Sequence, residues 1–220
     1  MTVTTDTAAL WTATHAERAR LADDLAGLTA EQWAAPSLCG DWTVEEVVAH
    51  LTAAASIGRW RWIASMVGAR FDPAVHNARR LAEHRGATPA ETLERFRAVV
   101  TSTVAPSGHT PAWLGEVVVH GEDVRRPLGI ADAPQTATTT PVAAFFASRD
   151  FTVAGKTVTR GLRLEATDGP FAAGEGPRVT GPTLALVMAM AGRVPHLDEL
   201  EGPGVATLRE RLSTPPAAGR

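Results

Sequence analysis

An acidic residue, a histidine and a second acidic residue lie at helical spacing in the stretch "GEVVVHGEDVRRPLG", residues 115–129. On a helix with about 3.6 residues per turn, Glu116, His120 and Asp123 fall on one face and their side chains can converge. A carboxylate and an imidazole placed together in this way can bind a divalent metal. Two other histidines of the chain also follow an acid by four residues. The spacing alone therefore does not separate a metal site from an ordinary amphipathic helix.

A second histidine can complete such a site from another helix. His50 follows "DWTVEEVVA" in a segment with a strong helix start, and it lies beside an apolar stripe. If its helix faces the helix that carries Glu116 and His120, the three residues supply two imidazoles and a carboxylate. This donor set suits a catalytic divalent metal, with zinc favoured and nickel or iron also accepted, and it leaves one position open for water or a thiolate.

The same residues allow a simpler interpretation. His50 can be a hydrogen-bonded histidine of the core, and Glu116 can be a solvated charge on a helix surface. Asp123 can orient the ring of His120 as a hydrogen-bond acceptor, or it can be a second solvated charge. Spacing and composition leave these alternatives open.

Helix starts position the candidate residues. A threonine followed three residues later by Glu or Gln forms a capping box, and proline after a capping residue marks the first helical turn. The capping boxes are Thr29/Gln32, Thr43/Glu46 and Thr88/Glu91, and the cap–proline pairs include Thr110-Pro111, Thr140-Pro141 and Gly181-Pro182. With the apolar periodicity behind them, these signals predict four long helices over 5–27, 43–68, 88–104 and 110–126, a short helix over 29–34 and a loop over 70–88. The four long helices are expected to bury their apolar stripes together as a bundle.

The pattern changes after residue 130. Residues 130–141 are linker-like, and a short helix with Phe145 and Phe146 follows. Apolar and charged residues alternate over 162–166, which predicts a half-buried strand, and "GPFAAGEGPRVTG" predicts a turn and a second strand. The apolar helix "PTLALVMAMAGR" comes next. The sequence therefore predicts a mainly α protein, with a helical bundle over 1–132 and a small α+β element over 133–220.

Composition narrows the class of function. The formal net charge is −3 and the basic residues are dispersed, so no phosphate-neutralising patch for nucleic acid is expected. The single cysteine, Cys39, excludes an intramolecular disulfide framework and fits a reducing cytoplasm. The N-terminus has neither the basic start nor the apolar run of a signal peptide, and no stretch has the length of a membrane span. We expect a cytoplasmic protein that binds neither nucleic acid nor a membrane.

Other notable side chains have structural interpretations. Cys39 is interpreted as a small buried hydrophobe, because no neighbouring base would explain its activation. Trp42 precedes the Thr43 cap and is expected to pack against Val47 as a hydrophobic staple. Trp60 and Trp62 are expected to pack in the core, with a place at the mouth of a pocket as the alternative.

The stretch "PSLCGDWTVEEVVAHL" together with "LGEVVVHGEDVRRPLG" resembles the two signature stretches of the mycothiol-dependent maleylpyruvate isomerase family, which belongs to the DinB-like metal-binding bundles. The resemblance covers residues 10–130. It implies a DinB-like four-helix bundle in which His50, Glu116 and His120 bind a divalent metal, usually zinc. The segment "GEGPRVTGPTLALVMAMAGR" is similar to the family's small C-terminal domain, which resembles sterol-carrier folds.

The resemblance also implies a function. Mycothiol, a low-molecular-weight thiol, would serve as cosubstrate, and the metal would activate its thiol for attack on a small electrophilic substrate, in a cis–trans isomerase or an S-transferase. Arg193 is the candidate for the family's functional arginine in the C-terminal domain. Arg125 and Arg126 are expected only to offset a helix dipole. A non-catalytic metal- or ligand-binding bundle, and a metal-dependent hydrolase, are the alternatives, and the chain is expected to be a monomer or a homodimer.

Overall fold

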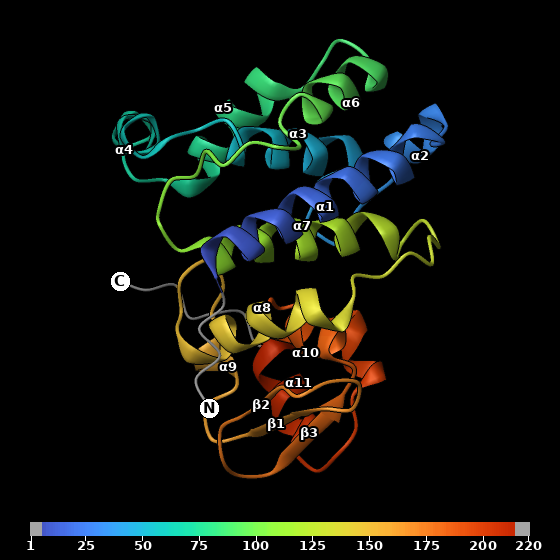
Figure 1. Ribbon diagram of the computed structural model, residues 1–220, viewed down its shortest axis with the longest axis vertical. Coiled ribbons are helices and arrows are strands. Elements are labelled where there is room, and N and C mark those ends of the chain that lie inside the picture. The colour runs from blue at the N-terminus through green and yellow to red at the C-terminus, as the bar shows by residue number, and fades with distance from the viewer. Residues whose placement is uncertain (1–5, 214–220) are drawn as a thin grey trace. The chain divides into compact units, whose positions relative to one another are not determined.

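The computed structural model describes residues 6–213, and the chain divides into two compact units, residues 1–133 and 134–220 (Figure 1). The first unit is entirely helical within its described part. Its helices are α1 (Thr7–Ala26), α2 (Ala30–Trp33), α3 (Val44–Ala54), α4 (Arg59–Gly68), α5 (Pro73–His84), α6 (Pro89–Arg97) and α7 (Thr110–Arg125). Helix α1 packs against α6 and α7, and α3 packs against α5, α6 and α7. Helices α1, α3, α6 and α7 therefore form a four-helix bundle, with α5 laid against α3.

Apolar residues from these helices form one continuous core. Its members are Leu21, Ala22, Leu25, Trp33, Val44, Val47, Val48, Leu51, Leu93, Phe96, Val117 and Val124. Most of these positions lie in the apolar stripes predicted from the sequence, because residues three and four apart share one face of a helix. Trp42 packs against the same core.

Capping fixes where several helices begin. Thr43 Oγ1 accepts a hydrogen bond from the Glu46 backbone N–H at 3.3 Å, and Glu46 Oε2 accepts one from the Thr43 N–H at 2.8 Å. The Thr29/Gln32 box is also complete. At the third predicted box, Thr88 accepts from Glu91, but the Glu91 carboxylate accepts from the Ala87 N–H instead of returning to Thr88. This third box is therefore only half formed.

The predicted long helix over 43–68 is wrong, because the chain forms two helices there. Helix α3 ends at Ala54, and α4 begins after Gly58, whose ψ of 166° is extended rather than helical. Ser102 Oγ donates to the Ala55 carbonyl at 2.8 Å, so a side chain from outside the helix satisfies a main-chain acceptor at the break. The break lets α4 leave the bundle, and none of its residues is buried.

The predicted loop over 70–88 is also wrong, since it contains α5. The Asp72 carboxylate accepts hydrogen bonds from the N–H groups of Ala74 and Val75, and Pro73 is the first helical residue. The same cap–proline signal marks the start of α6, where Pro89 follows the Thr88 cap. Helix α6 ends at Arg97 rather than at 104, and the predicted start of the first helix at residue 5 lies outside the described residues.

The second unit combines helices with a three-stranded sheet. Its elements are α8 (Thr136–Ser148), α9 (Gly155–Val158), β1 (Arg163–Ala166), β2 (Ala172–Ala173), β3 (Arg178–Gly181), α10 (Thr183–Met190), the 3₁₀ helix η1 (Val194–Glu199) and α11 (Val205–Ser213). The strand order is β2-β1-β3, in which β1 pairs antiparallel with β2 and parallel with β3. Helix α10 packs against α8, η1 and the sheet, and its apolar residues are buried.

Helix α8 begins at Thr136, so the predicted linker over 130–141 is too long and Pro141 lies inside the helix. Thr139 and Thr140 donate their hydroxyl hydrogens to the Thr136 carbonyl, which lies one turn earlier. Apart from such boundary changes, the prediction of a mainly α protein with a helical bundle and a small α+β element is confirmed. Among the described residues, no helix combines the length and apolarity needed to cross a membrane.

Candidate metal centre

Two facing helices bring the three predicted ligands together. His50 lies on α3, and Glu116 and His120 lie one turn apart on α7, which packs against α3. Glu116 Oε2 is 3.6 Å from His50 Nε2 and 3.2 Å from His120 Nε2. The two imidazole rings meet edge to face, with their centroids 4.9 Å apart. All three ligand atoms lie within 4.8 Å of one another.

These separations suit a bound divalent cation. Nitrogen and oxygen ligands lie about 2.0–2.2 Å from a four-coordinate zinc, so two neighbouring ligand atoms are roughly 3.3 Å apart. The two distances to Glu116 bracket that value. Two imidazoles and one carboxylate also match the donor types that such cations prefer. The donor set therefore fits a divalent metal.

Asp123 orients one of the imidazoles. Its carboxylate is fully buried, and Oδ2 lies 2.9 Å from Nδ1 of His120. An ionised carboxylate only accepts hydrogen bonds, so Nδ1 carries a proton, and Nε2, on the side of Glu116, is the nitrogen that can bind a metal once His120 is neutral. The interpretation of Asp123 as a solvated charge is therefore wrong.

The charges of the site stabilise one another. Burial opposes ionisation of Glu116, but hydrogen bonds and charge from His120 and His50 outweigh it and hold the pKa of Glu116 well below its usual range. Burial likewise opposes protonation of His120, yet interactions with Asp123, Cys39 and Glu116 raise its pKa well above the usual value. Without a metal, the negative charges of Glu116 and Asp123 thus keep the His120 ring in its protonated, positively charged form.

Cys39 and Trp42 lie near the site, although they were not predicted from the sequence as site residues. The Cys39 thiol shares a cluster with the ligand atoms of His120 and Asp123, all within 4.8 Å of one another. The absence of a neighbouring base, on which the buried-hydrophobe interpretation of Cys39 depended, is thus contradicted. The Trp42 ring lies 5.0 Å from the His50 ring and 6.4 Å from the His120 ring, between centroids.

The loop before α3 carries both of these residues and is tied to α7 through the main chain. The Leu38 N–H donates to the Asp123 carbonyl at 3.0 Å. Trp42 also lines a cleft of about 630 Å³ together with Glu46, Asn77 and Arg85. Its ring therefore lies beside the candidate metal centre and contributes to the lining of this cleft.

The arginines of the predicted site have different surroundings. Arg125 is buried, and its Nε donates to the Asp24 carboxylate of α1 at 2.7 Å, so it is a core ion pair rather than a surface residue near a helix end. Arg126 is exposed. Arg193 belongs to the second unit, where its guanidinium donates to the Ala191 carbonyl at 2.7 Å. Its catalytic role stays a prediction.

Trp60 and Trp62 do not pack in the core. Their exposed fractions are 77% and 38%. Both lie on α4, which the break after α3 carries away from the bundle core.

The fold is that of a DinB-like four-helix bundle. Two of its facing helices present two imidazoles and a carboxylate, which form the candidate metal centre. Residues 14–112 match the family model of the mycothiol maleylpyruvate isomerase N-terminal domain. The first unit thus contains a segment that matches the N-terminal domain of the mycothiol-dependent maleylpyruvate isomerases. The matched segment includes His50 and ends before Glu116 and His120.

Solved structures support the same fold. The chain is similar to the crystal structure of a mycothiol-dependent maleylpyruvate isomerase, with a TM-score of 0.58 and 14% identity. It is also similar to a mutant of that enzyme in which a histidine is replaced by alanine, with a TM-score of 0.60 and 15% identity. Each alignment covers 90% of this chain and 93% of the solved one. No curated protein matches the sequence.

Proposed function

We propose that the protein is a mycothiol-using isomerase that holds a divalent metal, zinc in the first instance, at His50, Glu116 and His120. The convergence of three metal-ligand atoms within 4.8 Å carries this proposal. The family match and the similarity to the two isomerase structures support the thiol and the reaction class. An S-transferase would use the same activated thiol on a different electrophile.

A divalent cation, when bound here, would supply charge that lowers the pKa of a thiol. The residues of the chain have separate roles. Asp123 holds the His120 ring in the tautomer that keeps Nε2 available, and the Trp42 ring lies beside the two imidazoles. Isomerisation needs a carbon–sulfur bond that forms and then breaks, so the thiol is regenerated. The negative charge that develops on the substrate meanwhile requires a cation, and Arg193 is our candidate.

We also propose that the two compact units are separate domains, with the boundary between residues 132 and 133. The contact pattern divides the chain next to this position and supports the proposal.

An assay with and without thiol tests the proposed function. We expect protein purified without added metal to contain about one divalent metal per chain and to isomerise maleylpyruvate only when mycothiol is present. Turnover without any thiol would identify a hydrolase-like use of the metal instead. If the protein binds metal but neither isomerises maleylpyruvate nor transfers the thiol to an electrophile, a non-catalytic bundle would be favoured.

Replacing Asp123 by Asn is expected to weaken metal binding by about 10- to 100-fold, because ring-orienting partners of metal-bound histidines contribute about this much. The isosteric amide keeps the volume of the buried side chain and removes its charge. The metal affinity should be measured by competition with a chromophoric chelator, with Asp41→Asn as an exposed control in the neighbouring loop. Unchanged affinity in Asp123→Asn would contradict the role assigned to this carboxylate.

A further inference from the structure

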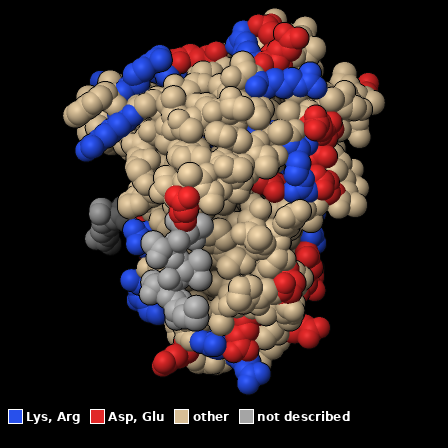
Figure 2. Space-filling model, viewed as in Figure 1, with Lys and Arg blue, Asp and Glu red and all other residues tan. Residues whose placement is uncertain are grey.

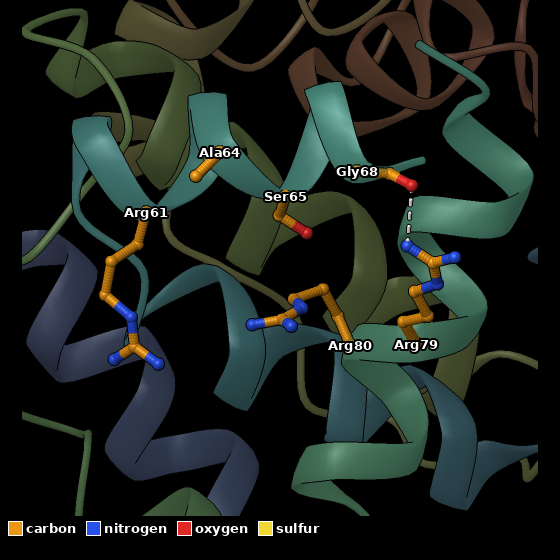
Figure 3. A pocket seen from close by; sticks show the side chains of 6 residues that line it. All are labelled: Arg61, Ala64, Ser65, Gly68, Arg79 and Arg80. Atoms are coloured by element: carbon orange, nitrogen blue, oxygen red, sulfur yellow. Dashed lines mark hydrogen bonds between the residues drawn. The ribbon is translucent and has the colours of Figure 1, made fainter. Parts of the chain in front are cut away.

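A second pocket, of about 310 Å³, lies between α4 and α5 and belongs to the first unit alone. Its walls consist of Arg61, Ala64, Ser65 and Gly68 from α4, with Arg79 and Arg80 from α5. Figure 3 shows Arg80 reaching into the space below Ser65 and Arg61 extending from α4 along one side of that space, whereas Arg79 turns toward the Gly68 carbonyl. One guanidinium group from each helix thus lines the pocket.

The arginines of this pocket have few acidic partners. Arg80 forms an ion pair with Glu83, although its buried Nε has no hydrogen-bond partner. Arg79 donates to the uncharged Gly68 carbonyl at 2.9 Å. Within the described range 6–213, Arg61 has neither a hydrogen bond nor an ion pair. Two of the three guanidinium charges are therefore not balanced by a carboxylate of the protein.

The surroundings add positive charge. Residues 59–85 contain six arginines and two acidic residues, although the whole chain has a net charge of −3. In Figure 2, basic side chains gather at the upper left, where Figure 1 places α4. Burial lowers the pKa of His84, and the charges of Arg80, Arg95 and Arg61 lower it further despite the opposing effect of Glu83. Like charges brought together in this way repel one another unless an anion balances them.

The Ser65 hydroxyl group also lines this pocket. Ser65 Oγ lies 2.9 Å from Nδ1 of His76, which is a buried side chain. When Nδ1 carries the proton, it donates to Ser65 Oγ and leaves the hydroxyl hydrogen free to donate into the pocket. The pocket then offers two guanidinium groups and one hydroxyl as donors.

We propose that this pocket binds a phosphate group, with Arg61, Arg80 and Ser65 as its hydrogen-bond donors. A phosphate monoester has a charge of about −1.5 to −2 and three acceptor oxygens, so it can balance the charges of Arg61 and Arg79 and accept hydrogen bonds from the three donors that line the pocket. Guanidinium groups bind phosphate through paired N–H donors. This proposal depends on neither the metal centre nor the isomerase activity.

The phosphate can belong to a soluble ester or to a lipid headgroup. Beside the pocket, α4 exposes Trp60, Ile63 and Val67, which lie on one stripe of the helix and have exposed fractions of 77%, 37% and 55%. An apolar stripe next to arginines is the pattern by which an amphipathic helix lies on an anionic membrane surface. The chemistry of the pocket is the same for both sources, so the experiment separates them.

The test measures binding of inorganic phosphate to the full chain by titration calorimetry at low salt. Arg61→Gln and Arg80→Gln should each weaken binding by about tenfold or more, because each removes a charge-assisted hydrogen bond. The control is Arg59→Gln, which removes the same charge from the same helix but lies outside the pocket, with its guanidinium over the Trp60 ring. It should change the affinity by less than about twofold. Glu116→Gln, which alters the candidate metal centre, should also leave phosphate binding unchanged.

A second arm uses vesicles of phosphatidylcholine with and without phosphatidic acid. Sedimentation of the wild type with the anionic vesicles, lost in Arg61→Gln and Arg80→Gln, would support a lipid phosphate as the natural ligand. Binding of inorganic phosphate without sedimentation would support a soluble ester. The proposal is overturned if neither probe binds, or if Arg59→Gln weakens binding as much as the pocket variants do.

Discussion

Replacing Glu116 by Gln is expected to empty the candidate metal centre while the bundle stays folded. The carboxylate lies between the two imidazoles, 3.2 Å from His120 Nε2 and 3.6 Å from His50 Nε2, so its loss removes the only anionic ligand of the three. We expect the metal content to fall from about one to below about 0.1 per chain, because a neutral amide is a poor ligand for such cations. Elemental analysis of purified protein measures this, with circular dichroism to verify the fold.

Matched variants make this prediction specific. Glu94→Gln, at an exposed position on α6, should keep the metal. His120 also belongs to the alternative group with Cys39 and Asp123, so a His120 variant would not separate the two groups. Cys39→Ser does separate them and should keep the metal. Retention of metal in Glu116→Gln together with its loss in Cys39→Ser would place the ion in the alternative group.

Replacing Asp24 by Ala is expected to lower the free energy of unfolding of the first unit by about 3–5 kcal/mol, since it leaves a buried charge without its partner. The Arg125 side chain is 1% exposed and donates to Asp24 at 2.7 Å, and its next acid, Asp132, is 3.8 Å away. All six tryptophans of the chain lie before residue 114. Tryptophan fluorescence during urea unfolding therefore reports on this unit alone.

The neighbouring Asp23 provides the control. It is exposed on the same helix, so Asp23→Ala should change the unfolding free energy by less than about 0.5 kcal/mol. The double variant Asp24→Leu with Arg125→Met should recover most of the loss, because apolar residues of similar volume can replace a buried ion pair. Equal stability of Asp23→Ala and Asp24→Ala would show that the pair contributes nothing.

The helices of the bundle could be predicted from the sequence wherever capping signals and apolar periodicity agree with the observed packing. The boxes at Thr29 and Thr43 place two helix starts, and the apolar stripes behind the starts identify most of the buried core. The break before α4 was not predicted, because the apolar pattern continues across it although Gly58 stops the helix. Helix α5 was missed although Asp72-Pro73 gives a start signal. Its apolar residues do recur at helical spacing, but several of them are alanines in a mostly polar segment.

In the candidate site, too, some residues could be predicted from the sequence and others could not. Helical spacing placed Glu116 and His120 on one face, whereas the choice of His50 as their partner depended on the resemblance to a known family. The three residues come together because all of them lie on helices of the bundle. Whether they bind a metal stays a prediction. The neighbours Cys39 and Trp42 lie in a loop, where no periodicity indicates the direction of a side chain. The burial of Asp123 depends on packing between α7 and this loop, which sequence spacing does not reveal.

The loop that carries Cys39 and Trp42 follows a path fixed by peptide groups. Besides the bond from Leu38 to Asp123, the Ser37 N–H donates to the Trp42 carbonyl, and the Val44 N–H donates to the Ala35 carbonyl. None of these bonds depends on the identity of a side chain, except that proline at a donor position would remove one. Side chains of this loop can therefore be exchanged while its backbone path is kept. This makes Trp42, which lines the cleft and lies beside both imidazoles, a position at which ligand selectivity can be varied without replacing the candidate metal ligands.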